Sequence, residues 1–159
     1  MPTKAISPAE PITELRHVPI RECGEPLVNF AERCPNLKID YPRFNYRREE
    51  LVRESLVQML NEAVSKLPSG YHLAIIEGWR APQIQARMYR GIWLRLQERH
   101  PDWSEITLRR VVNRYTAPIN AKVPPPHTTG GAVDVFLVDA NSRHYDHSSP
   151  YDPYDQRCF

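Results

Sequence analysis

The chain has 159 residues, of which 41% are hydrophobic and 25% are charged, the proportions of an ordinary globular protein. At this length we expect one domain spanning residues 1–159, able to bury about two-thirds of the surface of the unfolded chain. The formal net charge of +2 argues against a nucleic acid or an anionic membrane as the main partner.

The cysteines and the N-terminus bear on where the protein works. Cys23, Cys34 and Cys158 are odd in number and lack a Cys-x-x-Cys spacing, which favours free thiols over a disulfide framework or a thiolate metal site. The first ten residues contain no apolar run typical of a signal or membrane-spanning segment. We therefore expect a cytoplasmic protein with no membrane partner.

Hydrophobic periodicity predicts a series of helices and strands in chain order. The first 40 residues are rich in proline and read as an irregular N-terminal segment of the same domain, with an edge strand expected at Ile12–Ile20. Helices are predicted at Arg47–Lys66, Pro82–Arg99 and Trp103–Arg114, the last with Ser104 as its cap, and strands at Tyr71–Glu77 and Ala132–Val138. Non-helical connections between the strands favour an α+β fold with a small, mainly antiparallel sheet packed against helices.

The stretch His127-Thr-Thr-Gly-Gly-Ala-Val-Asp134 places an imidazole and a carboxylate on either side of a glycine turn. In a strand of period two, Asp134 shares a face with apolar residues, and both faces of this strand read as buried. A carboxylate there is costly unless a cation or several donors meet it. Zn²⁺ accepts this pair of nitrogen and oxygen ligands. Pairing of Asp134 with an arginine, and an ordinary loop role for His127, are the alternative interpretation.

A second motif, Glu77-Gly-Trp-Arg80-Ala-Pro82, follows the first predicted buried strand. An arginine held there between Gly78 and Pro82 indicates a specific anionic target. For Glu77 we favour the role of ion-pair partner to Arg80 over that of a catalytic base.

Together, these two motifs resemble those of the D-alanyl-D-alanine dipeptidases, zinc peptidases of the VanX type within the D-Ala-D-Ala carboxypeptidase and dipeptidase family. A later Tyr151-Asp-Pro-Tyr-Asp155 is similar to the family's aromatic-Asp-x-x-Asp segment. The resemblance implies a fold like that of hedgehog-type and DD-peptidase domains, and one zinc ion per chain.

The same resemblance implies roles for individual residues. His127 and Asp134 would be zinc ligands, Arg80 would stabilise the developing oxyanion, and Asp152 would bind the ammonium group of the dipeptide. Where the family has a serine two residues before the first ligand, this chain has Pro125.

The family takes its third zinc ligand and its general base from a Glu-x-x-His segment a few tens of residues beyond the Asp152 region, and this sequence has no such segment after Asp152. We therefore expect this sequence to be a fragment of a longer polypeptide, and a weak or inactive enzyme by itself, because catalytic zinc normally has three protein ligands. The alternative is that His144 or His147 bends back to the metal.

The function expected on this basis is zinc-dependent hydrolysis of D-alanyl-D-alanine, a small D-amino-acid dipeptide of cell-wall metabolism. Two alternatives stay open. One is a peptidoglycan D,D- or L,D-carboxypeptidase, and the other is a non-catalytic module that binds a metal or a D-peptide.

Overall fold

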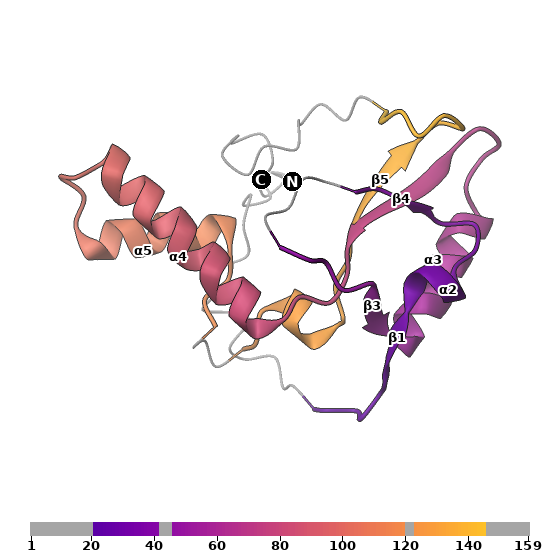
Figure 1. Ribbon diagram of the computed structural model, residues 1–159, viewed down its shortest axis with the longest axis horizontal. Helices are drawn as coiled ribbons and strands as arrows, with labels where there is room; N and C mark the ends of the chain where they lie inside the picture. Colours follow the sequence, from indigo (N-terminus) through magenta and orange to yellow (C-terminus); the bar gives the residue numbers. More distant parts are fainter. Residues whose placement is uncertain (1–20, 42–45, 120–122, 146–159) are drawn as a thin grey trace, which may run out of the picture.

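The computed structural model describes residues 21–41, 46–119 and 123–145, and within them the fold is α+β, which confirms the predicted class (Figure 1). Strand β4 (His72–Glu77) is the centre of a three-stranded sheet. Its neighbours are β5 (Asp134–Val138), which is antiparallel to it, and the short β2 (Lys38–Ile39), which is parallel. The register pairs Glu77 with Asp134, past an irregularity between Ile75 and Glu77, so two acidic residues meet at one end of the sheet.

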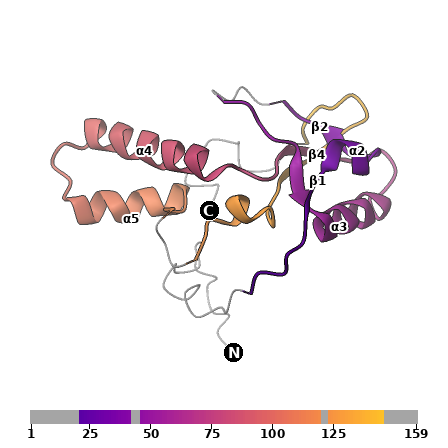
Figure 2. The ribbon, with the colours of Figure 1, turned by 60° about the horizontal axis from the view of Figure 1, so that its bottom comes forward.

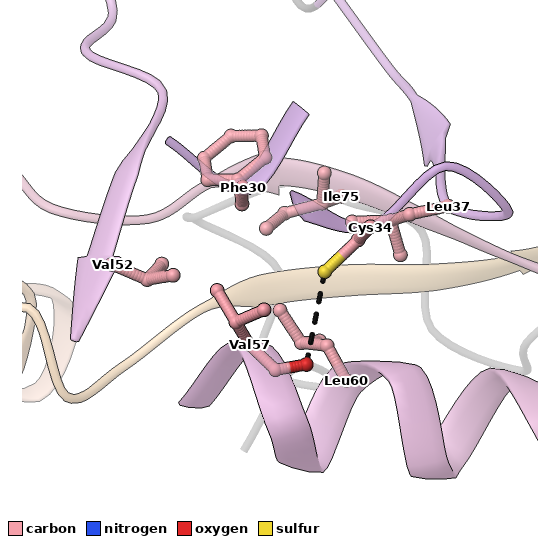
Figure 3. Close-up of a cluster of buried hydrophobic side chains, with 7 residues drawn as sticks. All are labelled: Phe30, Cys34, Leu37, Val52, Val57, Leu60 and Ile75. Carbon is pink, nitrogen blue, oxygen red and sulfur yellow. Dashed lines mark hydrogen bonds between the residues drawn. The ribbon is translucent and has the colours of Figure 1, made fainter. Parts of the chain in front are cut away.

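A second, two-stranded sheet lies beside the first and pairs β1 (Leu27–Asn29) with β3 (Leu51–Arg53) in antiparallel fashion. Two helices follow these strands directly, α2 (Phe30–Arg33) after β1 and α3 (Glu54–Ser65) after β3. Between the two sheets and α3 lies the main core, in which Cys34 donates a weak hydrogen bond from its thiol to the Val57 carbonyl at 3.7 Å (Figure 3). Its buried residues are Phe30, Cys34, Leu37, Val52, Val57, Leu60 and Ile75.

The remaining helices, α4 (Pro82–Arg99) and α5 (Glu105–Tyr115), form a hairpin that extends away from the sheets (Figures 1 and 2). The hairpin has an apolar cluster of its own, built from Ile92, Leu96, Leu108 and Val112. Proline stands at the first position of α4, where its missing N–H costs nothing, and Ser104 caps α5 by accepting a hydrogen bond from the Thr107 backbone N–H at 3.2 Å. The predictions for both helices are confirmed.

The predicted start of the preceding helix is wrong. We expected it at Arg47, but α3 begins at Glu54, and Leu51–Arg53 is a strand. Tertiary hydrogen bonds decide this, because the Leu51 carbonyl accepts from the Trp79 N–H at 2.6 Å and the Arg53 N–H donates to the Gly130 carbonyl at 2.9 Å. Val52, fully buried in the core, fits the helical spacing by coincidence.

Two further predictions need correction. The N-terminal segment is not irregular throughout, since its described part contains β1, α2 and β2, and the Asn29 side chain caps α2. Strand β5 begins at Asp134 rather than at Ala132, and it is not buried on both faces, because Val135 is 38% exposed. The edge strand expected at Ile12–Ile20 lies outside the described residues. Among the described helices, none combines the length and apolarity that crossing a membrane requires.

Candidate metal centre

His127 lies in a single 3-10 turn, η1 (Pro126–Thr129), which precedes β5. The turn is built locally, because the hydroxyl of Thr128 donates to the Pro125 carbonyl at 2.7 Å. It is held against the end of β4 by two further bonds. The Arg80 N–H donates to the His127 carbonyl at 3.0 Å, and the Trp79 indole N–H donates to the Thr128 carbonyl at 3.1 Å. The two motifs that the sequence analysis singled out are thus joined backbone to backbone.

Gly130 ends this turn, and two features favour glycine at this position. Its φ of +76° lies in the left-handed region, and a Cβ atom there would sit 2.4 Å from the Leu27 Cδ2 atom. Strand β3 holds the same corner, since the Arg53 guanidinium donates from Nε to the Thr129 carbonyl at 2.8 Å. Backbone contacts therefore fix the position from which His127 projects.

The His127 ring is oriented by the Gly78 carbonyl, which lies 2.9 Å from Nδ1. A carbonyl oxygen can only accept, so Nδ1 carries a proton and donates. The other ring nitrogen, Nε2, faces the Asp134 carboxylate with Oδ1 at 3.5 Å. In the neutral ring Nε2 bears a lone pair, so a lone pair faces a carboxylate. This arrangement is favourable only with a cation at Nε2, either a proton or a metal ion.

The pKa of His127 reflects the same arrangement in the metal-free protein. Burial of the ring lowers the pKa, but the hydrogen bond and the Coulombic attraction to Asp134, together with the Gly78 carbonyl, outweigh burial and raise it above its usual value. The site therefore attracts positive charge.

Glu77, at the end of β4, is only 1% exposed and is fully engaged by neighbours. The Arg80 guanidinium donates to it through two nitrogens, from Nε to Oε1 at 3.0 Å and from Nη2 to Oε2. The Tyr46 hydroxyl donates to Oε1 at 2.7 Å. Burial of the Tyr46 hydroxyl, and next its bond to this carboxylate, raise the pKa of Tyr46 well above its usual value. The prediction that Glu77 is the ion-pair partner of Arg80 is confirmed.

Asp134 is close to Arg80 as well, but this contact is weak. Nη2 lies 4.0 Å from Oδ2, beyond hydrogen-bonding distance, whereas the shorter contacts of the guanidinium go elsewhere. The alternative that an arginine satisfies Asp134 is therefore not favoured. Arg80 nevertheless lies at the same end of the sheet as the His127 and Asp134 side chains.

The donor set fits a divalent cation. Glu77, His127 and Asp134 offer ligand atoms that all lie within 4.8 Å of one another. Two ligand atoms, each about 2.1 Å from a tetrahedral zinc ion, are about 3.4 Å apart. The 3.5 Å between His127 Nε2 and Asp134 Oδ1 matches that spacing. Glu77 is the third potential ligand in reach, but its oxygens already bind Arg80 and Tyr46.

A cavity of about 310 Å³ borders the group and is lined in part by Glu77 and Arg80. Its other walls include Tyr46, Trp79 and Ile84. A small ligand in this space would lie against the side chain of Arg80.

Other residues singled out in the sequence lie elsewhere. His144 is at the opposite end of the sheet, where it forms a bridge with Val138, and its Nε2 lies 2.7 Å from the Asp40 carboxylate. Because β5 runs from Asp134 to Val138, this position is remote from the candidate centre, and the suggestion of His144 as a third ligand is wrong. His147 and Asp152 lie outside the described residues.

Sequence reasoning missed Tyr46, Gln85 and Thr116, all of which belong to the buried polar network around Arg80. Tyr46 and Thr116 gave no signal. The position of Gln85 did give a signal. It lies four residues before Tyr89 and seven before Ile92, on the face of α4 that packs against α5. A polar residue at such a position must find a partner inside the protein.

Comparison with known proteins gives one distant similarity. The chain is 24% identical to a protein of Synechocystis sp. (strain ATCC 27184 / PCC 6803 / Kazusa) named D-alanyl-D-alanine dipeptidase, over 81% of this chain. It spans 60% of the length of this curated relative. No family model and no solved structure matches the chain, so the likeness to hedgehog-type and DD-peptidase domains stays a prediction.

Proposed function

We propose that this chain is a zinc-peptidase domain that hydrolyses D-alanyl-D-alanine, with one zinc ion held by His127 and Asp134. The observation that carries the proposal is the lone pair of His127 Nε2, which faces Asp134 Oδ1 at 3.5 Å while Gly78 fixes the other ring nitrogen. The distant similarity to a protein named D-alanyl-D-alanine dipeptidase supports the choice of substrate.

The chemistry divides between the metal and the protein. Bound zinc would lower the pKa of a water molecule and so supply a nucleophile near neutral pH. Arg80 would donate hydrogen bonds to the negative charge that grows on the carbonyl oxygen, a role suited to a guanidinium that stays charged. Glu77 holds that guanidinium in place, and Gly78 keeps the proton on Nδ1 of His127.

Selection of the substrate would rest on Asp152, by resemblance to the family. Its carboxylate would form a charge-assisted bond with the free ammonium group of a dipeptide, which an acetylated amine cannot supply. Hydrolysis of D-Ala-D-Ala without hydrolysis of N-acetyl-D-Ala-D-Ala is the expected result. Efficient cleavage of the acetylated peptide would identify a carboxypeptidase instead.

A second candidate, a metal-dependent D-peptide-binding module without turnover, is favoured by one observation. The carboxylate nearest to the proposed ligands, Glu77, is occupied by Arg80 and Tyr46. General-base assistance is typically worth about 10²–10⁴-fold in rate, so a site whose nearest carboxylate is engaged in this way would bind a peptide but scarcely hydrolyse it.

Calorimetric titration with zinc and with D-Ala-D-Ala, beside an assay for released D-alanine, separates these functions. For the longer polypeptide to which we expect these residues to belong, the dipeptidase proposal expects one zinc ion per chain and D-alanine release above a metal-free control. Arg80→Ala should lower release by about 10²–10³-fold, much more than it weakens zinc binding. Binding of both ligands without release would establish the binding module. Failure to bind zinc would refute both.

A further inference from the structure

Gln85 is a buried polar residue that the proposed chemistry does not use. Its side chain, in the first turn of α4, is only 2% exposed. Its Oε1 accepts a hydrogen bond from Arg80 Nη1 at 2.7 Å. Its Nε2 donates to the Thr116 hydroxyl at 2.8 Å and to the Ala117 carbonyl at 2.8 Å. One amide therefore joins the guanidinium of Arg80 to the residues that follow α5.

Chemistry fixes the orientation of this amide. The guanidinium can only donate, and the Ala117 carbonyl can only accept. Rotating the Gln85 amide by 180° would place its N–H groups against those of Arg80 and its oxygen against the carbonyl. Gln85 therefore presents its oxygen as an acceptor to Arg80, and the amide is held in this orientation by the two hydrogen bonds that its nitrogen donates to Thr116 and Ala117.

The hydrogen bonds of Arg80 show what this acceptor does. A guanidinium has five N–H groups. Glu77 takes one from Nε and one from Nη2, and Gln85 takes one from Nη1. Within the described part of the chain, one N–H on each terminal nitrogen is then left for the remaining neighbours, the Tyr46 hydroxyl and the Asp134 carboxylate, and Nη2 lies 4.0 Å from Asp134 Oδ2. Those two N–H groups are the ones that could meet a ligand beside the candidate metal centre.

The pair formed with Glu77 cannot fix the guanidinium by itself, because both side chains could tilt together about their own torsions. Gln85 holds the opposite edge of the guanidinium, and it does so from α4 rather than from β4. Contacts from two separate elements fix a planar group in space as contacts from one element cannot. Thr116, only 9% exposed at the C-terminal end of α5, extends the support to the second helix of the hairpin.

We infer that Gln85 is a positioning residue: it aims the two remaining N–H groups of Arg80 at the oxyanion, and it makes their aim depend on the base of the α4–α5 hairpin. The role of Arg80 toward an oxyanion rests on the proposed function. The restraint of the Arg80 guanidinium by Gln85 does not depend on it.

The test therefore measures the hydrogen bonds of the Arg80 side chain directly. Protein labelled with ¹⁵N-arginine gives the hydrogen-exchange rates of the Arg80 Nη and Nε protons, assigned with Arg80→Lys. Gln85→Met keeps the size of the side chain and removes the acceptor. It should speed exchange at Nη1 by about tenfold or more, because hydrogen bonds to charged groups are strong. Gln97→Met, at an exposed position of the same helix, is the matched control and should change nothing.

A second variant separates aiming from plain structural support. Gln85→Glu keeps an acceptor for Arg80 but loses both donors to Thr116 and Ala117. Positioning predicts that Gln85→Glu retains slow exchange at Nη1 although it costs stability. If Gln85 served only to connect α4 to the residues after α5, the exchange rate at Arg80 Nη1 would rise in proportion to the loss of melting temperature. Gln85→Met and Gln85→Glu would then both show faster exchange. That outcome would overturn the inference. Should Gln85→Met not fold, Gln85→Ala, which also removes the acceptor, takes its place, and unchanged exchange at Nη1 in that variant would overturn the inference too.

A phosphinate analogue of D-Ala-D-Ala extends the test to the site, because its oxygens stand in for the oxyanion. In the zinc-loaded protein, Gln85→Met should weaken its binding by about 10- to 100-fold, the usual cost of losing a residue that orients a working group. An unchanged affinity of the analogue would overturn the aiming role. If the wild-type protein does not bind the analogue, the proposed function fails, and the exchange measurement still decides the role of Gln85.

Discussion

Replacing Glu77 by glutamine should destabilise the protein strongly, because it removes a charge that the interior needs. Glu77 is 1% exposed and Arg80 is 9% exposed, so neither charge is well screened by water. Glutamine keeps the shape of the side chain but leaves the guanidinium with only the Asp134 carboxylate, 4.0 Å away, as a counter-ion. Its amide also places N–H groups against a partner that can only donate. Breaking a buried pair in this way costs about 3–5 kcal/mol.

Thermal and urea denaturation measure this cost. In a domain of this size, 1 kcal/mol moves the melting temperature by about 2–4 °C, so Glu77→Gln should lower it by at least about 6 °C. Glu105→Gln is the matched control, because Glu105 pairs with Arg109 on the surface, where both side chains are more than half exposed. An exposed helical pair contributes about 0.3–0.5 kcal/mol, and its loss should scarcely register.

The double variant Glu77→Gln with Arg80→Met completes the experiment. Because it removes the uncompensated charge, it should be more stable than Glu77→Gln alone. Our reasoning would be refuted if Glu77→Gln were no more destabilising than Glu105→Gln, or if the double variant were the less stable of the two. Loss of zinc binding without loss of stability would instead make Glu77 a metal ligand.

Three further predictions concern the metal turn and the core. His127→Ala and Asp134→Asn should each weaken zinc binding in calorimetry by more than about tenfold, because a lost ligand costs more than a lost supporting contact. Gly130→Ala should cost at least about 1–2 kcal/mol of stability on urea denaturation, from its left-handed backbone, and should weaken zinc binding as the turn shifts. Burial raises the pKa of the Cys34 thiol, so Cys34 should resist a thiol-specific disulfide reagent in the folded protein and react on unfolding, whereas the exposed Cys23 should react at once.

Each of these predictions has a control. Asp139→Asn alters a carboxylate of the residue that follows β5, whose partners are backbone N–H groups, and should leave zinc binding intact. Gly70 has a φ of +88° with open space around its Cβ position, so Gly70→Ala carries the backbone cost alone. Equal zinc affinity in Gly130→Ala and Gly70→Ala would contradict the claim that the turn sets the position of His127. Fast labelling of a Cys23→Ser, Cys158→Ser variant in its folded state would contradict the burial of Cys34.

Local patterns were enough to predict α4, α5 and β4 closely. Pro82 and Ser104 mark helix starts through their own backbone chemistry, and the apolar run before Glu77 is read from neighbouring residues alone. The meeting of His127 with Asp134 could be expected for the same reason, because only six residues, which include a glycine turn, separate them. Short-range steric and hydrogen-bonding preferences do not require knowledge of the rest of the chain.

Contacts between distant segments decided the rest. Val52 has the spacing of a helical residue, but pairing with β1, and hydrogen bonds from its neighbours to Trp79 and Gly130, make its segment a strand. Glu77 and Asp134 belong to two separate sequence motifs, and only the register between β4 and β5 places them opposite one another. Gln85 meets Thr116 only because a helical hairpin folds back across 31 residues. Such contacts depend on which surfaces remain to be buried once every element has formed, and no local pattern encodes that.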